Sequence, residues 1–255
     1  MTVFEWYPVL VALVFGAVIG SFLNVVIYRL PLGRSIVRPG SACPSCHKLL
    51  AWYDNIPVLS YIVLAGRCRG CRSRISARYP LVELISALSA SALVWRFGLT
   101  LQAAWIYAFV AIMLAITLID WDHQIIPDPL SIGGVVLGWA GAAVCLDIGL
   151  LQSLIGSLAG AGVILAIALL YKAVRKVDGM GGGDVKLMAM IGAFVGWQGT
   201  LLALFIASIL ATIVFIPINI RSKKLVPFGI FLAIGGAVVF AWGERLLDWY
   251  MTGFA

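Results

Sequence analysis

Two pairs of cysteines in the first third of the chain have the spacing of a metal site. Two residues separate Cys43 from Cys46, two separate Cys68 from Cys71, and 21 residues lie between the pairs. Each pair can present two sulfur atoms from one tight turn, and two such turns complete a tetrahedron of thiolates. The pattern predicts a zinc ion held by four cysteines. Four protein ligands leave no position for a catalytic water, which favours a structural ion.

Other interpretations of these cysteines remain open. Two disulfides would need an oxidising compartment, whereas this loop is expected on the reducing cytoplasmic side. A redox-active pair usually begins a helix in a thioredoxin-like fold, for which the sequence gives no pattern. His47 is an alternative ligand, although a polar loop residue explains it more simply. Cys145, alone in an apolar segment, is expected to be a small buried side chain.

Acidic residues gather at two places beside apolar segments. Asp120, Asp122 and Asp128 follow one such segment, and Asp184 follows the glycines at 181–183 at the start of another. Ionisable side chains near the bilayer core are costly and tend to mark functional sites. Two carboxyl groups a few ångströms apart share one proton, so one can activate a water molecule while the other polarises a carbonyl group. Two aspartates in this arrangement would hydrolyse a peptide bond.

Simpler roles for the same residues also remain open. Asp184 could be the N-cap of a helix, and Asp120 could be a solvated helix end. The glycines, among them Gly181 and Gly183, loosely match a phosphate-binding loop. However, they follow an apolar helix rather than a strand and lack the Gly-Lys-Ser/Thr ending. Their missing side chains would let the backbone approach a substrate or the partner acid closely.

The elements that must position these groups are apolar helices. Of the 255 residues, 62% are hydrophobic and 11% are charged, whereas soluble proteins carry about 25% charged residues. Around 20 apolar residues cross a bilayer as a helix, and continuous runs without alternation exclude a barrel. The predicted spans are 8–28, 80–96, 101–119, 130–147, 151–171, a short sixth at 185–197, 199–219 and 227–243. We therefore expect an all-α, polytopic membrane bundle of about eight transmembrane helices.

Basic residues are distributed unevenly between the connecting loops. Of 18 Lys and Arg, nine lie at 29–78 and seven at 172–186 and 221–224, whereas Arg96 and Arg245 fall on the opposite side. The positive-inside rule then places both termini outside and the 29–79 loop in the cytoplasm. The net charge of +7 reflects this topology and contact with membrane lipids. Nucleic-acid binding is disfavoured, because no stacking aromatic residues interleave with the charge.

This topology places the two candidate acids on the same side of the membrane and indicates three parts of the chain. The third span runs inward and the sixth runs outward, so Asp120 and Asp184 both lie at cytoplasmic ends. The predicted domains are a first transmembrane helix (1–31), a cytoplasmic zinc-binding insertion (32–79) and a bundle carrying the aspartates (80–255). The insertion is too short to fold around an apolar core alone, so the metal is expected to hold it together.

Taken together, these segments resemble the bacterial type IV prepilin peptidases. Gly181-Gly182-Gly183-Asp184 fits the Gly-x-Gly-Asp signature of intramembrane aspartyl proteases. The other matching segments are the cysteine pairs, Gly20-Ser21-Phe22-Leu23-Asn24-Val25-Val26-Ile27-Tyr28-Arg29-Leu30-Pro31, Trp52-Tyr53-Asp54-Asn55-Ile56-Pro57 and Arg78-Tyr79-Pro80-Leu81-Val82-Glu83. The resemblance covers roughly residues 16–232. It implies an endopeptidase of the bacterial cytoplasmic membrane that removes the basic leader of prepilins or pseudopilins, with Asp120 and Asp184 as catalytic acids and Gly181 and Gly183 supporting the active-site loop.

The same resemblance implies a second activity, methylation of the new N-terminus with S-adenosylmethionine. Asn24, Asp54 and Glu83 are loose candidates for residues related to this transfer. The family usually has a second proline where this chain has Ile230, and we expect this departure to affect local packing more than chemistry.

The charge of the loops and the predicted topology indicate which residues contact the substrate and which other functions compete with proteolysis. A basic leader is a poor partner for the basic 29–79 loop, so Asp122, Asp128 and Asp178 are the predicted leader contacts. An ion-coupled transporter using Asp120 and Asp184 is the main alternative, but it would need a pathway through both membrane faces. A zinc-binding scaffold without catalysis would keep its function when both aspartates are replaced.

Overall fold

The computed structural model describes residues 3–177, 181–222 and 227–253. They form helices joined by loops, and strand-like pairing among them is limited to two isolated bridges, Ala42 with Leu49 and Arg67 with Arg74. The prediction of an all-α fold is therefore confirmed. The chain divides into two compact units, Met1–Ala111 and Ile112–Ala255, and helix α4 (Leu101–His123) contributes residues to each.

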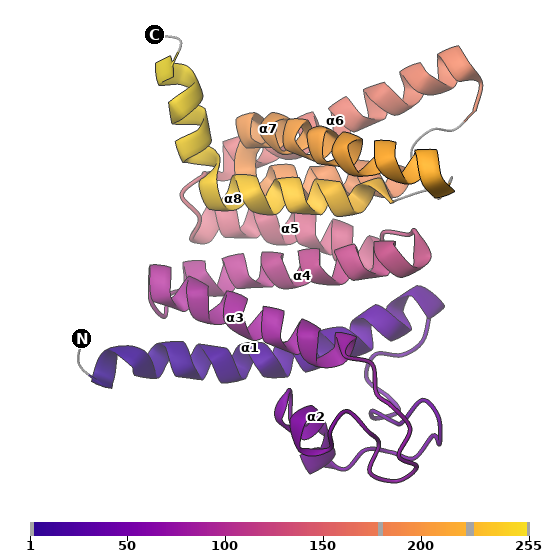
Figure 1. The fold of residues 1–255 in the computed structure, drawn as a ribbon. Coiled ribbons are helices and arrows are strands. Elements are labelled where there is room, and N and C mark those ends of the chain that lie inside the picture. The colour runs from indigo at the N-terminus through magenta and orange to yellow at the C-terminus, as the bar shows by residue number, and fades with distance from the viewer. Residues whose placement is uncertain (1–2, 178–180, 223–226, 254–255) are drawn as a thin grey trace. The chain divides into compact units, whose positions relative to one another are not determined.

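In the first unit, α1 (Val3–Arg29) and α3 (Arg78–Phe97) pack against each other along their lengths (Figure 1). Small residues make this contact close: a Cβ atom placed on Gly20 would lie 2.6 Å from the Cα atom of Glu83. The Ser86 hydroxyl donates to the Gly16 carbonyl oxygen at 2.7 Å. Close backbone approach and side-chain hydrogen bonds are how helices associate where water is absent. The segment of the chain that connects α1 to α3 contains the short helices η1 (Leu30–Leu32), η2 (Trp52–Asn55) and α2 (Leu59–Val63).

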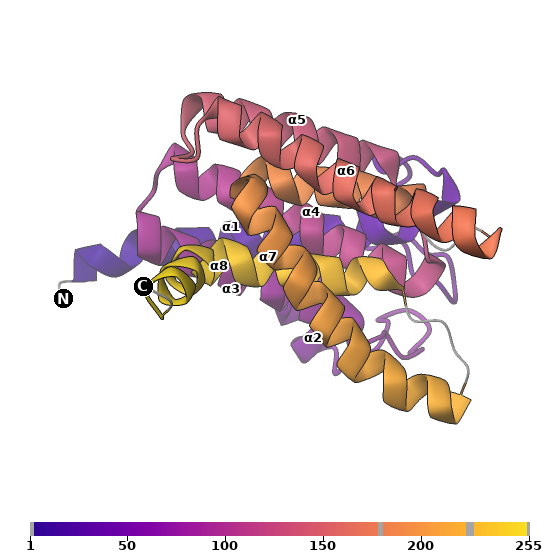
Figure 2. The ribbon, with the colours of Figure 1, turned by 90° about the horizontal axis from the view of Figure 1, so that it is seen from above.

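The second unit contains α5 (Asp128–Val144), α6 (Leu150–Arg175), α7 (Gly182–Ser222) and α8 (Phe228–Gly253) (Figure 2). Helix α7 is broken at Gly196, whose φ of 69° and ψ of 178° are not helical. A Cβ atom on Gly160 of α6 would contact both Met188 and Thr200. In a straight helix these two residues would be about 18 Å apart along the axis. The two halves of α7 therefore fold back along each other as a hairpin.

Within the part of the chain that the structure describes, five helices are long and apolar enough to cross a membrane, namely α1, α3, α4, α6 and α7. Two shorter apolar helices, Asp128–Val144 and Phe228–Gly243, accompany them. When the halves of α7 are counted separately, these helices correspond to the eight apolar segments predicted from the sequence. Their outer faces carry exposed apolar side chains, such as Val14 at 65% and Leu158 at 74% exposure, which suits contact with lipid.

Candidate active site and metal centre

Asp120 and Asp184 come together at two helix ends of the second unit. Asp120 lies in the last turn of α4, and Asp184 lies in the first turn of α7. The Asp120 side chain is buried at 5% exposure, whereas Asp184 is half-buried. They are close enough for the charge of Asp184 to act on Asp120. The structure thus pairs the two acids that topology placed at the same membrane depth.

The first turn of α8 covers Asp120. The backbone N–H of Ile230 donates a hydrogen bond to the Asp120 carboxylate, and this N–H is available because the first N–H groups of a helix have no partner inside it. A Cβ atom on Gly229 would lie 2.5 Å from Asp120 Oδ2. Among the described residues, Oδ2 has no hydrogen-bond partner. Ile230 was expected to affect mainly local packing. In the structure its backbone N–H also contacts the Asp120 carboxylate directly.

Ile126, in the loop between α4 and α5, explains why glycines surround the acids. A Cβ atom on Gly183 would lie 2.9 Å from Ile126 Cβ, and one on Gly229 would lie 3.2 Å from Ile126 Cδ1. Both glycines are thus held against one isoleucine. Gly181 is different, because a Cβ atom there would meet only the Gly183 nitrogen, at 3.9 Å. A side chain at position 183 would therefore clash with Ile126, whereas the space around Gly181 would admit one.

The predicted leader contacts have different surroundings. Asp128 accepts a hydrogen bond from Lys186 Nζ at 2.5 Å, while its side chain keeps 58% of its surface exposed. This pair ties the start of α5 to the first turn of α7, next to Asp184. Asp122 is exposed in the last turn of α4. Asp178 lies outside the described residues.

The four predicted zinc ligands form one cluster. The Sγ atoms of Cys43, Cys46, Cys68 and Cys71 all lie within 4.8 Å of one another. The Sγ atoms of Cys43 and Cys71 are 3.8 Å apart, which matches the edge of about 3.8 Å in a tetrahedron of thiolates at 2.3 Å from zinc. The donor set and its geometry fit a metal ion, and His47 is not a member of the cluster.

The two cysteine pairs sit in turns of the same design. Cys43 N donates to Lys48 O at 3.0 Å, and Cys68 N donates to Ser73 O at 2.9 Å. The residue after each pair, His47 or Arg72, has a positive φ of 57° or 60°. Backbone N–H groups of Cys46 and Ser45 point at the Cys43 sulfur and lower the pKa of this thiol to about 6, which favours the thiolate that binds metal.

The candidates for methyl transfer all lie in the first unit, each with a defined contact. Asn24 Nδ2 donates to the Tyr79 carbonyl oxygen at 3.1 Å. Asp54 forms a salt bridge with Arg69 at 2.8 Å, beside the second cysteine turn. Glu83, at 8% exposure, accepts hydrogen bonds from the Val58 N–H at 2.7 Å and from the Ser21 hydroxyl.

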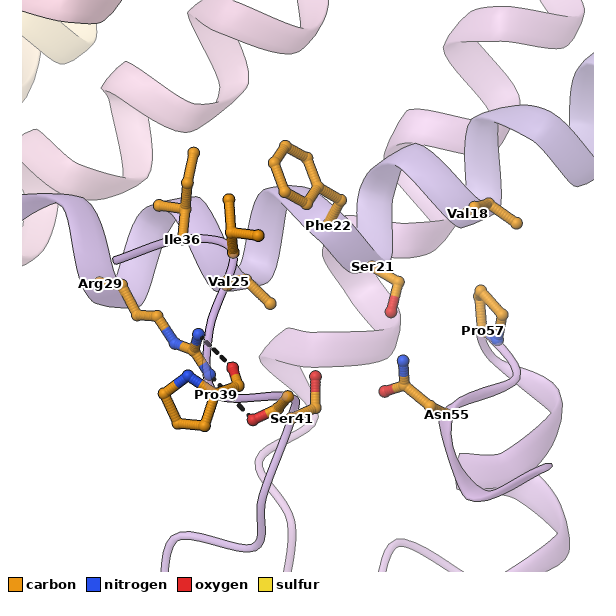
Figure 3. Close-up of a pocket in the computed structure, with 12 residues that line it drawn as sticks. Val18, Ser21, Phe22, Val25, Arg29, Ile36, Pro39, Ser41, Asn55 and Pro57 are labelled. Atoms are coloured by element: carbon orange, nitrogen blue, oxygen red, sulfur yellow. Dashed lines mark hydrogen bonds between the residues drawn. The ribbon is translucent and has the colours of Figure 1, made fainter. Parts of the chain in front are cut away.

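A pocket in the same unit lies beside α1 (Figure 3). Its wall includes Ser21 and Phe22 of α1, the loop segment 36–41, Asn55 and Pro57. Of these residues, Ser21, Phe22, Asn55 and Pro57 lie in the family motifs, close to Asn24 and Asp54. The signal that could have found the wall is the helical spacing of Val18, Ser21, Phe22 and Val25 on one face of α1. The family pattern draws attention to Ile230, but no sequence signal links Gly229 and Ile230 to Asp120, which is more than 100 residues away.

Comparison with known proteins gives consistent matches along the chain. Residues 14–97 match the bacterial peptidase A24 N-terminal domain, and residues 107–216 match the type IV leader peptidase family. The prepilin leader peptidase/N-methyltransferase of Pseudomonas aeruginosa is 37% identical, over 95% of this chain and 93% of its own length. The proteins of that name from Aeromonas hydrophila and Burkholderia pseudomallei are 34% and 37% identical, over 98% and 91% of this chain and 96% and 84% of their own lengths. No solved structure gives a significant match. With relatives this similar over nearly its whole length, the chain belongs to the type IV leader peptidase family.

Proposed function

We propose that this chain is a membrane aspartyl endopeptidase that removes the leader peptide of type IV prepilins or pseudopilins and then N-methylates the new N-terminus. The observation that carries the protease function is the pairing of a buried Asp120 with Asp184 at two adjoining helix ends. Family membership supports the same activity, because the relatives are named prepilin leader peptidase/N-methyltransferase.

The proposed reaction uses one acid as base and the other as acid. The ionised carboxylate takes a proton from water while the water oxygen attacks the scissile carbonyl carbon, and the protonated acid donates to the carbonyl oxygen. When the tetrahedral intermediate collapses, the C–N bond breaks and the leaving amine gains a proton. Oδ2 of Asp120 is buried and has no donor among the described residues, whereas the half-buried Asp184 is open to a water molecule that would be placed for attack.

We also propose the orientation and the leader contacts. The basic residues at the ends of α6 and α7, including Lys172, Arg175 and Lys186, support a position of the aspartates on the cytoplasmic side of a bacterial inner membrane. The apolar helix of the substrate would enter from the lipid, with its basic leader in the cytoplasm. Asp122 and Asp128 are exposed near Asp120 in the sequence and remain the candidates to attract this leader.

For the cysteine cluster we propose a structural zinc ion. The ion would be held by all four thiolates, leaving no open position for hydrolytic chemistry. Binding energy from such a site is available for folding a loop that has little apolar core. The methyl group for N-methylation would come from S-adenosylmethionine, whose sulfonium makes the methyl carbon electrophilic.

The test of the protease function is cleavage of a prepilin in detergent by wild type, Asp120→Asn and Asp184→Asn. Each variant keeps the shape of the side chain but removes its acid–base capacity. Asp248→Asn, at an exposed position of α8, is the matched control. Loss of cleavage in both folded active-site variants, with the control active, is expected. Cleavage by either folded variant above about 1% of the wild-type rate would exclude that residue from the pair.

A further inference from the structure

The pocket beside α1 has the construction of a small-molecule site. Its volume is about 330 Å³, at the lower end of the range of about 300–1,000 Å³ for ligand pockets. Apolar side chains of α1, among them Phe22 and Val25, form one wall. Figure 3 shows the Ser21 hydroxyl and the Asn55 carboxamide directed toward the space between them. The pocket therefore combines an apolar surface with a few convergent polar groups.

Arg29 holds the opposite wall in place. Its guanidinium donates to the carbonyl oxygens of Ser35 at 3.1 Å, Pro39 at 2.7 Å and Gly40 at 3.1 Å. These three bonds fix the loop against the end of α1, and Figure 3 draws those to Pro39 and Gly40. A guanidinium has five N–H donors, so two remain for a further acceptor. This end of the pocket is thus suited to a carboxylate.

An acidic side chain lies directly behind the pocket near Ser21. Glu83 accepts hydrogen bonds from the Ser21 hydroxyl and from the Val58 N–H, which follows the pocket residue Pro57. Both donors are neutral, and the salt bridges Arg69–Asp54 and Lys186–Asp128 of the described residues do not involve Glu83. A buried carboxylate without a cation is costly, so this part of the pocket favours a cationic ligand group.

We infer that this pocket binds S-adenosylmethionine, with the methyl donor's cationic half toward Glu83 and its carboxylate toward Arg29. Phe22 offers an apolar surface for the adenine ring, and Ser21 and Asn55 offer hydrogen bonds to polar atoms. One ligand with a flat ring, a cation and a carboxylate thus matches all three features. This inference rests on the proposed N-methyltransferase function and assigns it a binding site.

The test is equilibrium dialysis of the detergent-solubilised full chain with radiolabelled S-adenosylmethionine. Asn55→Ala removes an exposed polar group, and Val25→Trp fills the pocket. Val14→Trp, on an exposed face of α1 outside the lining, is the matched control. We expect about tenfold or greater weakening for the two pocket variants and wild-type binding for the control. Absence of binding by wild type, or equal binding by all variants, would overturn the inference.

The role of Glu83 has its own readout. S-adenosylhomocysteine lacks the sulfonium charge, so wild type should bind it more weakly than S-adenosylmethionine. Glu83→Gln keeps the hydrogen-bond acceptor but removes the charge, and should abolish this preference; an unchanged preference would refute the electrostatic role. Prepilin cleavage by wild type is measured separately. If wild type cleaves prepilin but does not bind S-adenosylmethionine, the protease function is supported and the pocket assignment is refuted. If it binds S-adenosylmethionine but does not cleave prepilin, the pocket assignment is supported and the protease function is refuted.

Discussion

Gly229→Ala adds a single methyl group next to the proposed catalytic acid. The new Cβ atom would lie 2.5 Å from Asp120 Oδ2 and 3.2 Å from both Asp120 Cγ and Ile126 Cδ1. Gly229 is not among the described glycines with a positive φ, so alanine meets no backbone strain there. Any effect must therefore come from the displaced carboxylate and not from an altered turn.

The size of the effect follows from the distance. A carbon and an oxygen in contact lie about 3.3–3.6 Å apart, so the Asp120 carboxylate must move by roughly 0.8–1.1 Å. Misplacement of a reacting group by about 1 Å can cost about a hundredfold in rate. We expect kcat for prepilin cleavage to fall by about 10- to 100-fold, equivalent to about 1.4–2.7 kcal/mol in activation free energy. KM should change little, because the leader contacts are elsewhere.

Steady-state cleavage of a prepilin by the purified variant measures this effect, with the thermal unfolding midpoint as a check on folding. Gly133→Ala is the matched control, because a Cβ atom on this α5 glycine has no atom within 4 Å. Wild-type kcat in a folded Gly229→Ala variant would refute the placement of α8 against Asp120. A raised KM with unchanged kcat would instead place Gly229 in substrate binding.

Three further predictions concern neighbouring groups. Ile230→Pro removes the N–H that reaches Asp120, introduces the residue that the family usually has at this position and keeps a φ suited to the first turn of a helix; we expect cleavage to persist with a displaced pH profile, and an unchanged profile would show that the hydrogen bond does not influence the acid. Gly183→Ala should reduce cleavage about tenfold or more because of Ile126, whereas Gly181→Ala should stay within about twofold; equal activities in the same assay would contradict the steric reasoning. Cys68→Ser should lower bound zinc, measured by mass spectrometry of the purified protein, from about one ion per chain to well below one, and full occupancy would rule out the four-thiolate site.

The sequence predicts those parts of the molecule whose signals are local. Apolar runs give the helices because a spanning segment must satisfy its own backbone. The spacing of Cys43, Cys46, Cys68 and Cys71 gives the metal cluster because each pair occupies one turn. Counting spans brings Asp120 and Asp184 to one side, since this needs only the parity of the helices. None of these inferences requires knowledge of how loops pack.

The rest depends on contacts between residues distant in the chain. Asp128 is a predicted leader contact, and the structure adds a partner that the sequence does not indicate, because Lys186 lies against it across 58 residues of sequence. Ile126 sets the steric requirement at Gly183 and Gly229, although no sequence motif links it to either glycine. The pocket wall includes Ser21 and Asn55, which lie close in sequence to the predicted residues Asn24 and Asp54. The contacts of Lys186 with Asp128 and of Ile126 with the two glycines have no periodicity that a sequence could reveal.

The unequal environments of the two aspartates suggest unequal tasks. Asp120 is buried, receives the Ile230 N–H and is enclosed by Gly229, so its carboxylate has little freedom to move. Asp184 is half-buried on a glycine-rich turn, so water and substrate can reach it more easily. A substrate entering between the helix ends would therefore meet a fixed acid on one side and an accessible one on the other. Preorganisation of this kind requires only one of the two groups to be held rigidly, and α8 holds Asp120.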